Sequence, residues 1–292
     1  DDDTGDDDPE PPVLRGACDL ADKVGAFLVQ HEPEYTAVSG EVRDGVVPIA
    51  VLENVMEEGG CRLLRRNNPF CEPPCDPGET CDFDGQCIPY PANVDVGTVT
   101  ITGLNKEVVM EPPGEGLPAS YYDTQMPHPG FDPGAAVRLD ASGSEIGGFT
   151  MYGEGFAPLE IADETWVVRP DEPLVVSWTA QAGDQVRILL RFNIDQHGTT
   201  PVEVWCDVED SGTASIPVDV MNGLIAYGVS GFPSGDAYRR SLDSVDTDAG
   251  CVEFEISSHV HGELAVEGHI PCDSPDDCPE GMECDIPTGT CI

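Results

Sequence analysis

The stretch QVRILLRFN, residues 185–193, decides the fold expected of this chain. Its apolar side chains recur at every second position from Val186 to Phe192, and Arg187 and Arg191 stand between them. A two-residue period is typical of a strand that buries one face and exposes the other. The segment CVEFEISS, residues 251–258, has the same period. Strands are also predicted for TVTITGL (98–104), AAVRLDA (135–141), TWVVR (165–169), PLVVSWTA (173–180) and PVEVWCDV (201–208).

Short strands separated by glycine, proline and aspartate turns fill residues 94–270, where the one helical turn expected is at residues 217–224. This pattern predicts an antiparallel β-sandwich. The expected fold class is therefore all-β. A smaller N-terminal β unit at residues 13–70 and two small disulfide-rich modules, at residues 71–93 and 271–292, accompany the sandwich.

The N-terminal unit contains a half-buried strand, in which Val38 and Val42 share one parity while Glu41 and Arg43 share the other. Cys18 and Cys61 lie near the two ends of this unit, and we expect them to bond to each other. Cys206 and Cys251 are the two cysteines inside the predicted sandwich, and we expect a second bond between them.

Twelve cysteines, an even number, indicate a disulfide framework. Zinc ligands usually come as recurring C-x2-4-C pairs, and only Cys71 and Cys75 have that spacing. Disulfides form and persist in oxidising compartments. The cysteines therefore predict an extracellular or cell-surface location, and they leave no thiol for catalysis if all twelve pair.

Two cysteine-rich segments are an internal repeat: CEPPCDPGETCDFDGQCI (71–88) and CDSPDDCPEGMECDIPTGTCI (272–292). Each has the pattern C-x3/5-C-x5-C-x5/6-C, with turn-forming Pro and Gly between the cysteines. The pattern resembles the four-cysteine modules of dickkopf-like and EGF-like secreted proteins. Four cysteines allow three connectivities, and the resemblance implies first-to-third and second-to-fourth bonding. The implied bonds are Cys71–Cys81, Cys75–Cys87, Cys272–Cys284 and Cys278–Cys291.

The chain is strongly acidic, with 56 acidic against 13 basic residues and a net charge of −43. This charge repels nucleic acid and anionic membranes, so neither is an expected partner. The acidity has three interpretations: it keeps an extracellular protein soluble, it gathers divalent cations such as calcium, or it is an adaptation to salt.

Residues 1–12, DDDTGDDDPEPP, lack any apolar side chain and are expected to form a flexible tether. Such acidic tethers resemble those that follow the lipidated cysteine of bacterial outer-surface lipoproteins, which implies a lipid anchor upstream of Asp1. The abrupt start suggests a mature form from which an export signal was removed. No apolar run approaches the ~20 residues that a membrane helix needs, so no transmembrane segment is expected.

Motifs of enzymes are missing from the sequence. There is no G-x-S-x-G and no phosphate-cradling glycine loop. Residues 182–185 are expected to be a hairpin turn, and Asp195-Gln196-His197-Gly198 a second turn between strands, which explains the Asp and Gly there.

Two sets of residues are candidate metal ligands. His259 and His261 share one face of a strand, and by parity Glu255, Glu263 and Glu267 lie on that face as well. The alternative is a solvated outer face or a turn. Asp243, Asp246 and Asp248 precede Gly250 and resemble the start of a calcium loop, as Asp82 and Asp84 before Gly85 do. The alternative for these aspartates is ordinary turn chemistry.

Trp205 has the parity opposite to Val204 and Cys206, so its side chain is predicted to face outward as a ligand platform. The alternative is that it packs in the core with the other two tryptophans.

These features favour a non-enzymatic extracellular or cell-surface protein with a structural or adhesive role. Its expected partners are other surface proteins, itself or glycans. A glycan- or calcium-dependent binding module is the second hypothesis, with calcium as the one cofactor considered. A secreted hydrolase that uses paired carboxylates is the third.

Overall fold

A computed structural model describes residues 12–112, 114, 117–163, 165–181, 183, 185–194 and 202–292. Most of the predicted tether, parts of the hairpin at 182–185 and the turn containing His197 lie outside the described residues.

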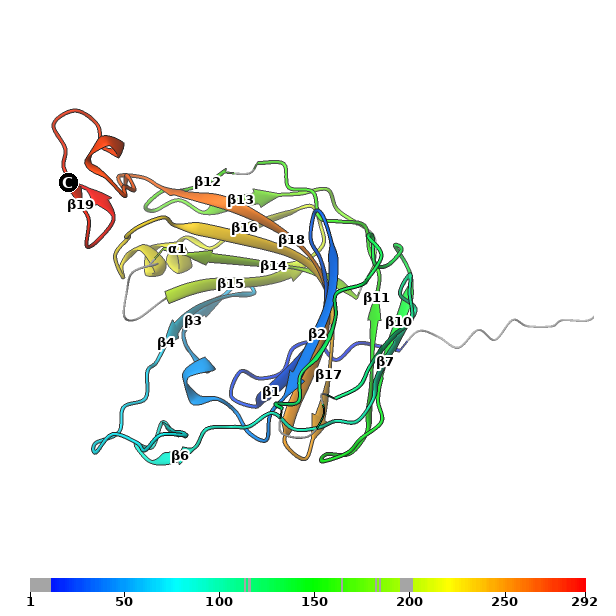
Figure 1. Cartoon of the computed structure of the whole chain (residues 1–292). Coiled ribbons are helices and arrows are strands. Elements are labelled where there is room, and N and C mark those ends of the chain that lie inside the picture. The colour runs from blue at the N-terminus through cyan, green and yellow to red at the C-terminus, as the bar shows by residue number, and fades with distance from the viewer. Residues whose placement is uncertain are drawn as a thin grey trace, which may run out of the picture.

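The centre of the molecule is one ten-stranded sheet, strongly curved, which we call the large sheet (Figure 1). Its longest strands are β17 (Ser234–Thr247) and β18 (Gly250–Val266), which form a hairpin with Asp248 and Ala249 at the turn. The other strands are β3 (Leu52–Glu58), β4 (Cys61–Arg66), β15 (Val202–Glu209), β14 (Val186–Asn193), β1 (Lys23–His31), β2 (Thr36–Val42), β9 (Tyr121–Asp123) and β12 (Thr165–Val168). The sheet order is β3-β4-β15-β14-β17-β18-β1-β2-β9, and β12 also pairs with β18.

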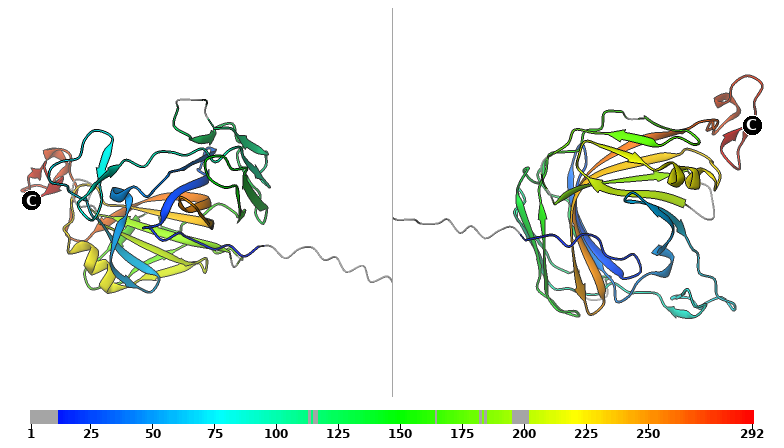
Figure 2. Two further views of the ribbon diagram at one scale, coloured as in Figure 1. Left: turned by 90° about the horizontal axis from the view of Figure 1, so that it is seen from below. Right: turned by 180° about the vertical axis from the view of Figure 1, so that it is seen from behind.

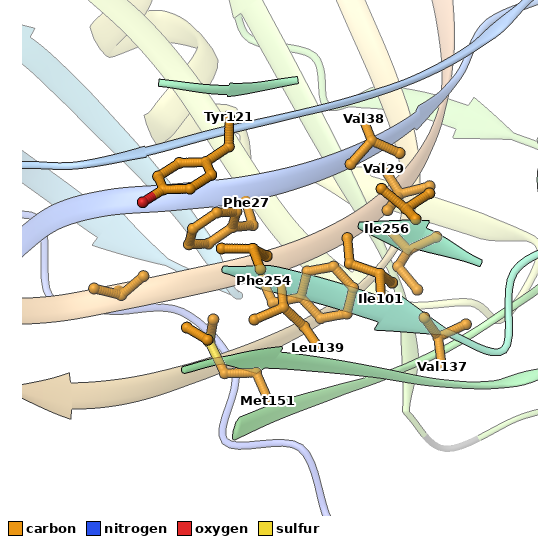
Figure 3. Packing of buried hydrophobic residues seen from close by; sticks show 14 of the residues in the cluster. Phe27, Val29, Val38, Ile101, Tyr121, Val137, Leu139, Met151, Phe254 and Ile256 are labelled. Atoms are coloured by element: carbon orange, nitrogen blue, oxygen red, sulfur yellow. The ribbon is translucent and has the colours of Figure 1, made fainter. Parts of the chain in front are cut away.

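A four-stranded sheet covers one half of the convex side of the large sheet. It consists of β7 (Val99–Thr102), β8 (Val108–Met110), β10 (Ala136–Ala141) and β11 (Phe149–Glu154). The alternating residues of both sheets interdigitate there, with Phe27 and Phe254 on one side and Leu139 and Met151 on the other (Figure 3).

A second layer covers the other half of the same side. It consists of the pair β13 (Leu174–Ser177) and β16 (Thr213–Ile216) and of α1 (Val218–Ile225). These elements close a second core around Ile188, Leu190 and Phe192 of β14. The alternation in residues 185–193 is thus confirmed, because β14 buries the side chains predicted to face inward.

The two disulfide-rich modules lie on the side of the molecule away from the four-stranded sheet (Figure 2). The first contains β5 (Glu79–Cys81) and β6 (Cys87–Pro89); the second contains η2 (Pro275–Asp277), β19 (Cys284–Asp285) and β20 (Thr290–Cys291). A short helix, η1 (Pro48–Ala50), precedes β3. The four bonds implied by the module resemblance are all present: Cys71–Cys81, Cys75–Cys87, Cys272–Cys284 and Cys278–Cys291.

The two long-range bonds differ from those predicted. Cys18 bonds to Cys251, and Cys61 bonds to Cys206, so the predicted Cys18–Cys61 and Cys206–Cys251 bonds are wrong. The reason is the strand order. β1 runs parallel to β18 with Lys23 opposite Cys251, and β4 runs antiparallel to β15 with Cys61 opposite Cys206.

The half-buried strand expected in the N-terminal unit is present as β2, but β1 to β4 all pair into the large sheet instead of forming a sheet of their own. The parallel pairings of β18 with β1 and with β12 also make the large sheet mixed, where the sequence predicted antiparallel pairing. The all-β fold with small disulfide-rich modules is confirmed.

Candidate functional site

The concave side of the large sheet carries a dense set of polar and aromatic side chains. Successive side chains of a strand point to opposite faces, and the residues between these side chains point to the covered side. We call the members on β14, β15, β17 and β18 the charged face. They are Arg187, Arg191, Glu203, Trp205, Asp207, Asp236, Tyr238, Arg240, Glu253, Glu255, His259 and His261.

Arg240 lies at the middle of the charged face and joins two strands. Its Nη1 donates to Glu255 Oε2 at 3.0 Å and its Nη2 donates to Asp207 Oδ2 at 2.7 Å. Asp207 also accepts from Arg187. Burial disfavours the charged form of Arg240, but Glu255 and Asp207 outweigh burial and raise the pKa of Arg240. These ion pairs hold the four strands β14, β15, β17 and β18 in a fixed arrangement.

Trp205 lies on the charged face, as its parity predicted, and is half-buried outside both cores. Its Nε1 donates to Glu203 Oε2 at 2.7 Å, and the same oxygen accepts from Arg191 Nη2 at 2.9 Å. The Arg191 guanidinium carbon lies 4.6 Å from the centroid of the indole ring. The indole is therefore held by a cation–π contact and a shared carboxylate.

A cavity of about 290 Å³ lies over this part of the sheet and is lined by Arg191, Trp205, Tyr238 and Arg240. A larger cavity of about 740 Å³ adjoins it, because Leu20, Lys23 and Leu28 line both cavities. We call the larger cavity the apolar trough. Its lining includes Ala26, Leu28, Val47, Ile49, Tyr90 and Tyr122. The concave side thus offers a charged half and an apolar half next to each other.

The two predicted histidine ligands lie at one end of the charged face, and the structure brings them together with a carboxylate. His259 Nε2 and His261 Nδ1 each lie 2.9 Å from Asp236 Oδ1. Glu32, at the end of β1, places its Oε2 3.4 Å from His259 Nδ1. The hydrogen bond with Asp236 raises the pKa of His259, and burial opposes this without cancelling it.

The carboxylate beside the histidines differs from those the sequence suggested. Asp236 is on the neighbouring strand, opposite His261, while Glu255 pairs with Arg240. The hairpin register is the signal that would have found it. Thr247 lies opposite Gly250 at the turn. Counting away from the turn, one residue at a time on each strand, leads to the Asp236–His261 pair.

The structure does not bring Asp243, Asp246 and Asp248 together as a ligand set in the described part of the chain. Asp243 is buried and accepts from the backbone N–H of Arg15 at 3.0 Å and of Tyr152 at 2.9 Å. It therefore fastens the N-terminal segment and β11 to the large sheet. Asp82 likewise accepts from the backbone N–H groups of Asp84 and Gln86, which is turn chemistry.

No protein-family model matches the chain, and no curated protein matches it. Within the described residues, helices are too short or too polar to cross a bilayer.

Proposed function

We propose that this protein is an exported, non-enzymatic adhesive protein that binds carbohydrate on the charged face. The observation that carries the proposal is the Arg191–Glu203–Trp205 cluster, in which a guanidinium lies over an aromatic ring and a carboxylate bonds its N–H, with Arg191 and Trp205 lining a cavity. The six disulfides support a location outside the reducing cytoplasm, at the cell surface or beyond it.

The chemistry of a sugar suits this cluster. A pyranose ring has apolar C–H faces that pack on an aromatic ring and hydroxyl groups that both donate and accept hydrogen bonds. Arg191 supplies donors and Glu203 supplies acceptors in fixed positions on adjacent strands. A site on strands holds such groups more rigidly than a site on loops, which lowers the ordering cost of binding.

The charge balance of the cavity favours a neutral or weakly acidic sugar. Lys23, Arg62, Arg191 and Arg240, four of the 13 basic residues, line this one cavity. Asp207, Glu253 and Glu255 line it too. In a chain of net charge −43, a cavity lined by four cations and three anions repels acidic ligands far less than the rest of the surface does.

The test is a glycan array followed by titration of the strongest binder against Trp205→Ala. Loss of the indole face should weaken binding about 5- to 150-fold, if a sugar face gains about the 1–3 kcal/mol that a nucleic-acid base gains by stacking on an aromatic side chain. The matched control is Tyr227→Ala, a 43% exposed aromatic residue after α1, on the covered side of the sheet. Equal affinity of Trp205→Ala and wild type, or a wild type that binds no glycan, would contradict the proposal.

A protein partner is the second candidate, and the apolar trough favours it. Ile49, Tyr90 and Tyr122 line this trough and are 45%, 48% and 70% exposed. Exposed apolar side chains around a cavity are typical of protein contact sites. Tyr122→Ser should then reduce capture of a surface protein or self-association, measured by light scattering against concentration, while glycan affinity stays unchanged.

A further inference from the structure

We propose that Asp236, His259 and His261 bind a divalent transition-metal ion of zinc-like chemistry, with Glu32 orienting His259 from the other side of its ring. This metal site is separate from the carbohydrate proposal, and each holds or fails without the other.

The three ligand atoms are close to a metal-binding geometry. His259 Nε2, His261 Nδ1 and an Asp236 carboxylate oxygen lie within 4.8 Å of one another. Ligand atoms bound tetrahedrally at about 2.0–2.1 Å from zinc are about 3.3–3.4 Å apart. The two nitrogens lie 2.9 Å from Asp236 Oδ1. Opening each of these distances by roughly half an ångström makes room for an ion with bond lengths in the zinc range.

The backbone holds the ligands in place before any ion binds. His259 and His261 are two residues apart on β18 and share a face, and Asp236 is directly opposite His261 on β17. These strands form a long hairpin inside the large sheet. A bound ion therefore does not have to order a loop, and little conformational entropy opposes binding.

Two further contacts fix the ring of His259. Tyr238 stacks on it with 4.7 Å between centroids and 13° between planes. Glu32 Oε2 faces Nδ1 at 3.4 Å. A carboxylate that accepts from one ring nitrogen leaves the lone pair of the other nitrogen for a metal, and this carboxylate–histidine–metal arrangement raises ligand affinity. Here the nitrogen available to a metal is Nε2, whose present partner is Asp236 Oδ1.

The donor set identifies the class of ion. Two imidazoles and one carboxylate suit zinc, copper(II) or nickel, whereas calcium and magnesium prefer oxygen ligands only. The side chain of His261 is 65% exposed, so an ion reaches the site from solvent. His261 also lines a cavity of about 360 Å³, which leaves space for a water or an external ligand at an open coordination position.

The experiment is a zinc titration of the full chain after chelator treatment, followed by calorimetry in millimolar calcium. The calcium occupies the many surface carboxylates, so that weak binding to the acidic surface does not mask the site. We expect one zinc per chain, a higher melting temperature with zinc, and ligand-field bands of nitrogen–oxygen coordination when cobalt(II) replaces zinc.

Variants separate a metal site from a simple ion pair. His261→Ala, at an exposed position, should retain the fold and lose at least tenfold in zinc affinity, and Glu32→Gln should lose about 10- to 100-fold if it orients His259. His128→Ala, which removes an exposed histidine elsewhere, is the matched control and should bind zinc like wild type. Undetectable saturable binding in wild type, or unchanged affinity in His261→Ala, would overturn the proposal.

Discussion

Arg239 and Arg240 are neighbours on β17, but their side chains point to opposite faces of the large sheet. Arg239 lies on the covered side and pairs with Asp210, where the two side chains are 2% and 1% exposed. It also donates to the backbone carbonyls of Ala157, Pro158 and Thr179. Arg240 lies on the charged face, and its partner Asp207 is 34% exposed.

The comparison shows that one sheet uses the same residue type for two purposes. On the covered side, every polar group of the Arg239 cluster has a protein partner and water cannot replace it. On the charged face, the partners of Arg240 remain within reach of water or a ligand. Side chains on the covered side therefore determine stability, and those on the charged face are available for binding.

The largest effect is expected from Arg239→Met. The change leaves Asp210 charged and buried with Trp178 Nε1 as its remaining donor, at 2.6 Å. Removing one partner of a buried ion pair costs about 3–5 kcal/mol. The free energy of unfolding in guanidinium chloride measures the loss, with disulfides intact. A loss no greater than that of Arg240→Met would contradict the distinction between the two faces.

A smaller effect is expected from Arg240→Met. Asp207 retains Arg187, and the oxygens that Arg240 releases on Asp207 and Glu255 regain water, so the cost should be about 1–2 kcal/mol. The same unfolding measurement applies. Glycan affinity should fall in this variant and stay unchanged in Arg239→Met at a temperature where both are folded.

The smallest effect is a pH dependence at the end of the charged face. The pKa of His259 in the folded protein is raised above 6.5, so the protonated histidine stabilises the fold. This contribution is fully present below pH 6.5 and is lost as the pH rises through the folded-state pKa. Since both side chains of the pair are partly exposed, we expect on the order of 0.5–1 kcal/mol.

The measurement is the difference in unfolding free energy between wild type and His259→Gln, from pH 5.5 to pH 9 in chelator. The difference cancels the histidines that do not contact this pair, such as the buried His31, whose pKa burial lowers. At the acid end of this pH range, burial disfavours the charged form of Asp236. Its hydrogen bonds with His259 and His261 outweigh burial and hold the pKa of Asp236 below the usual range. A difference that does not change with pH would show that the Asp236–His259 pair contributes no linked stability.

Local periodicity predicted the strands and their faces because a two-residue period admits only two orientations. Cys206 faces the core and Trp205 faces away from it, as their parity required. The module bonds were predicted from a resemblance that depends on cysteine spacing over about 20 residues. None of these features depends on how distant strands meet.

Strand order was beyond the sequence patterns, because it depends on which distant segments bury each other best. β1 pairs with β18 more than 220 residues away in the chain, and the two long-range disulfides follow from that order. The carboxylate beside His259 and His261 was missed for a related reason. Parity places Glu255 on the face of His259, but four residues along a strand are about 13 Å apart. The carboxylate within reach comes from the next strand.

The Cys18–Cys251 bond has a mechanical consequence. When force is applied to the chain on either side of this pair, the covalent path runs through the sulfur atoms and excludes the intervening chain, a sequence separation of 233 residues. Both cores draw most of their residues from that excluded loop. Tension on a protein attached at its two ends would therefore peel part of β18 but leave the loop unstretched. The Cys61–Cys206 bond lies inside the same loop. After a single proteolytic cut in the chain between Cys61 and Cys206, both disulfides therefore still join the two fragments.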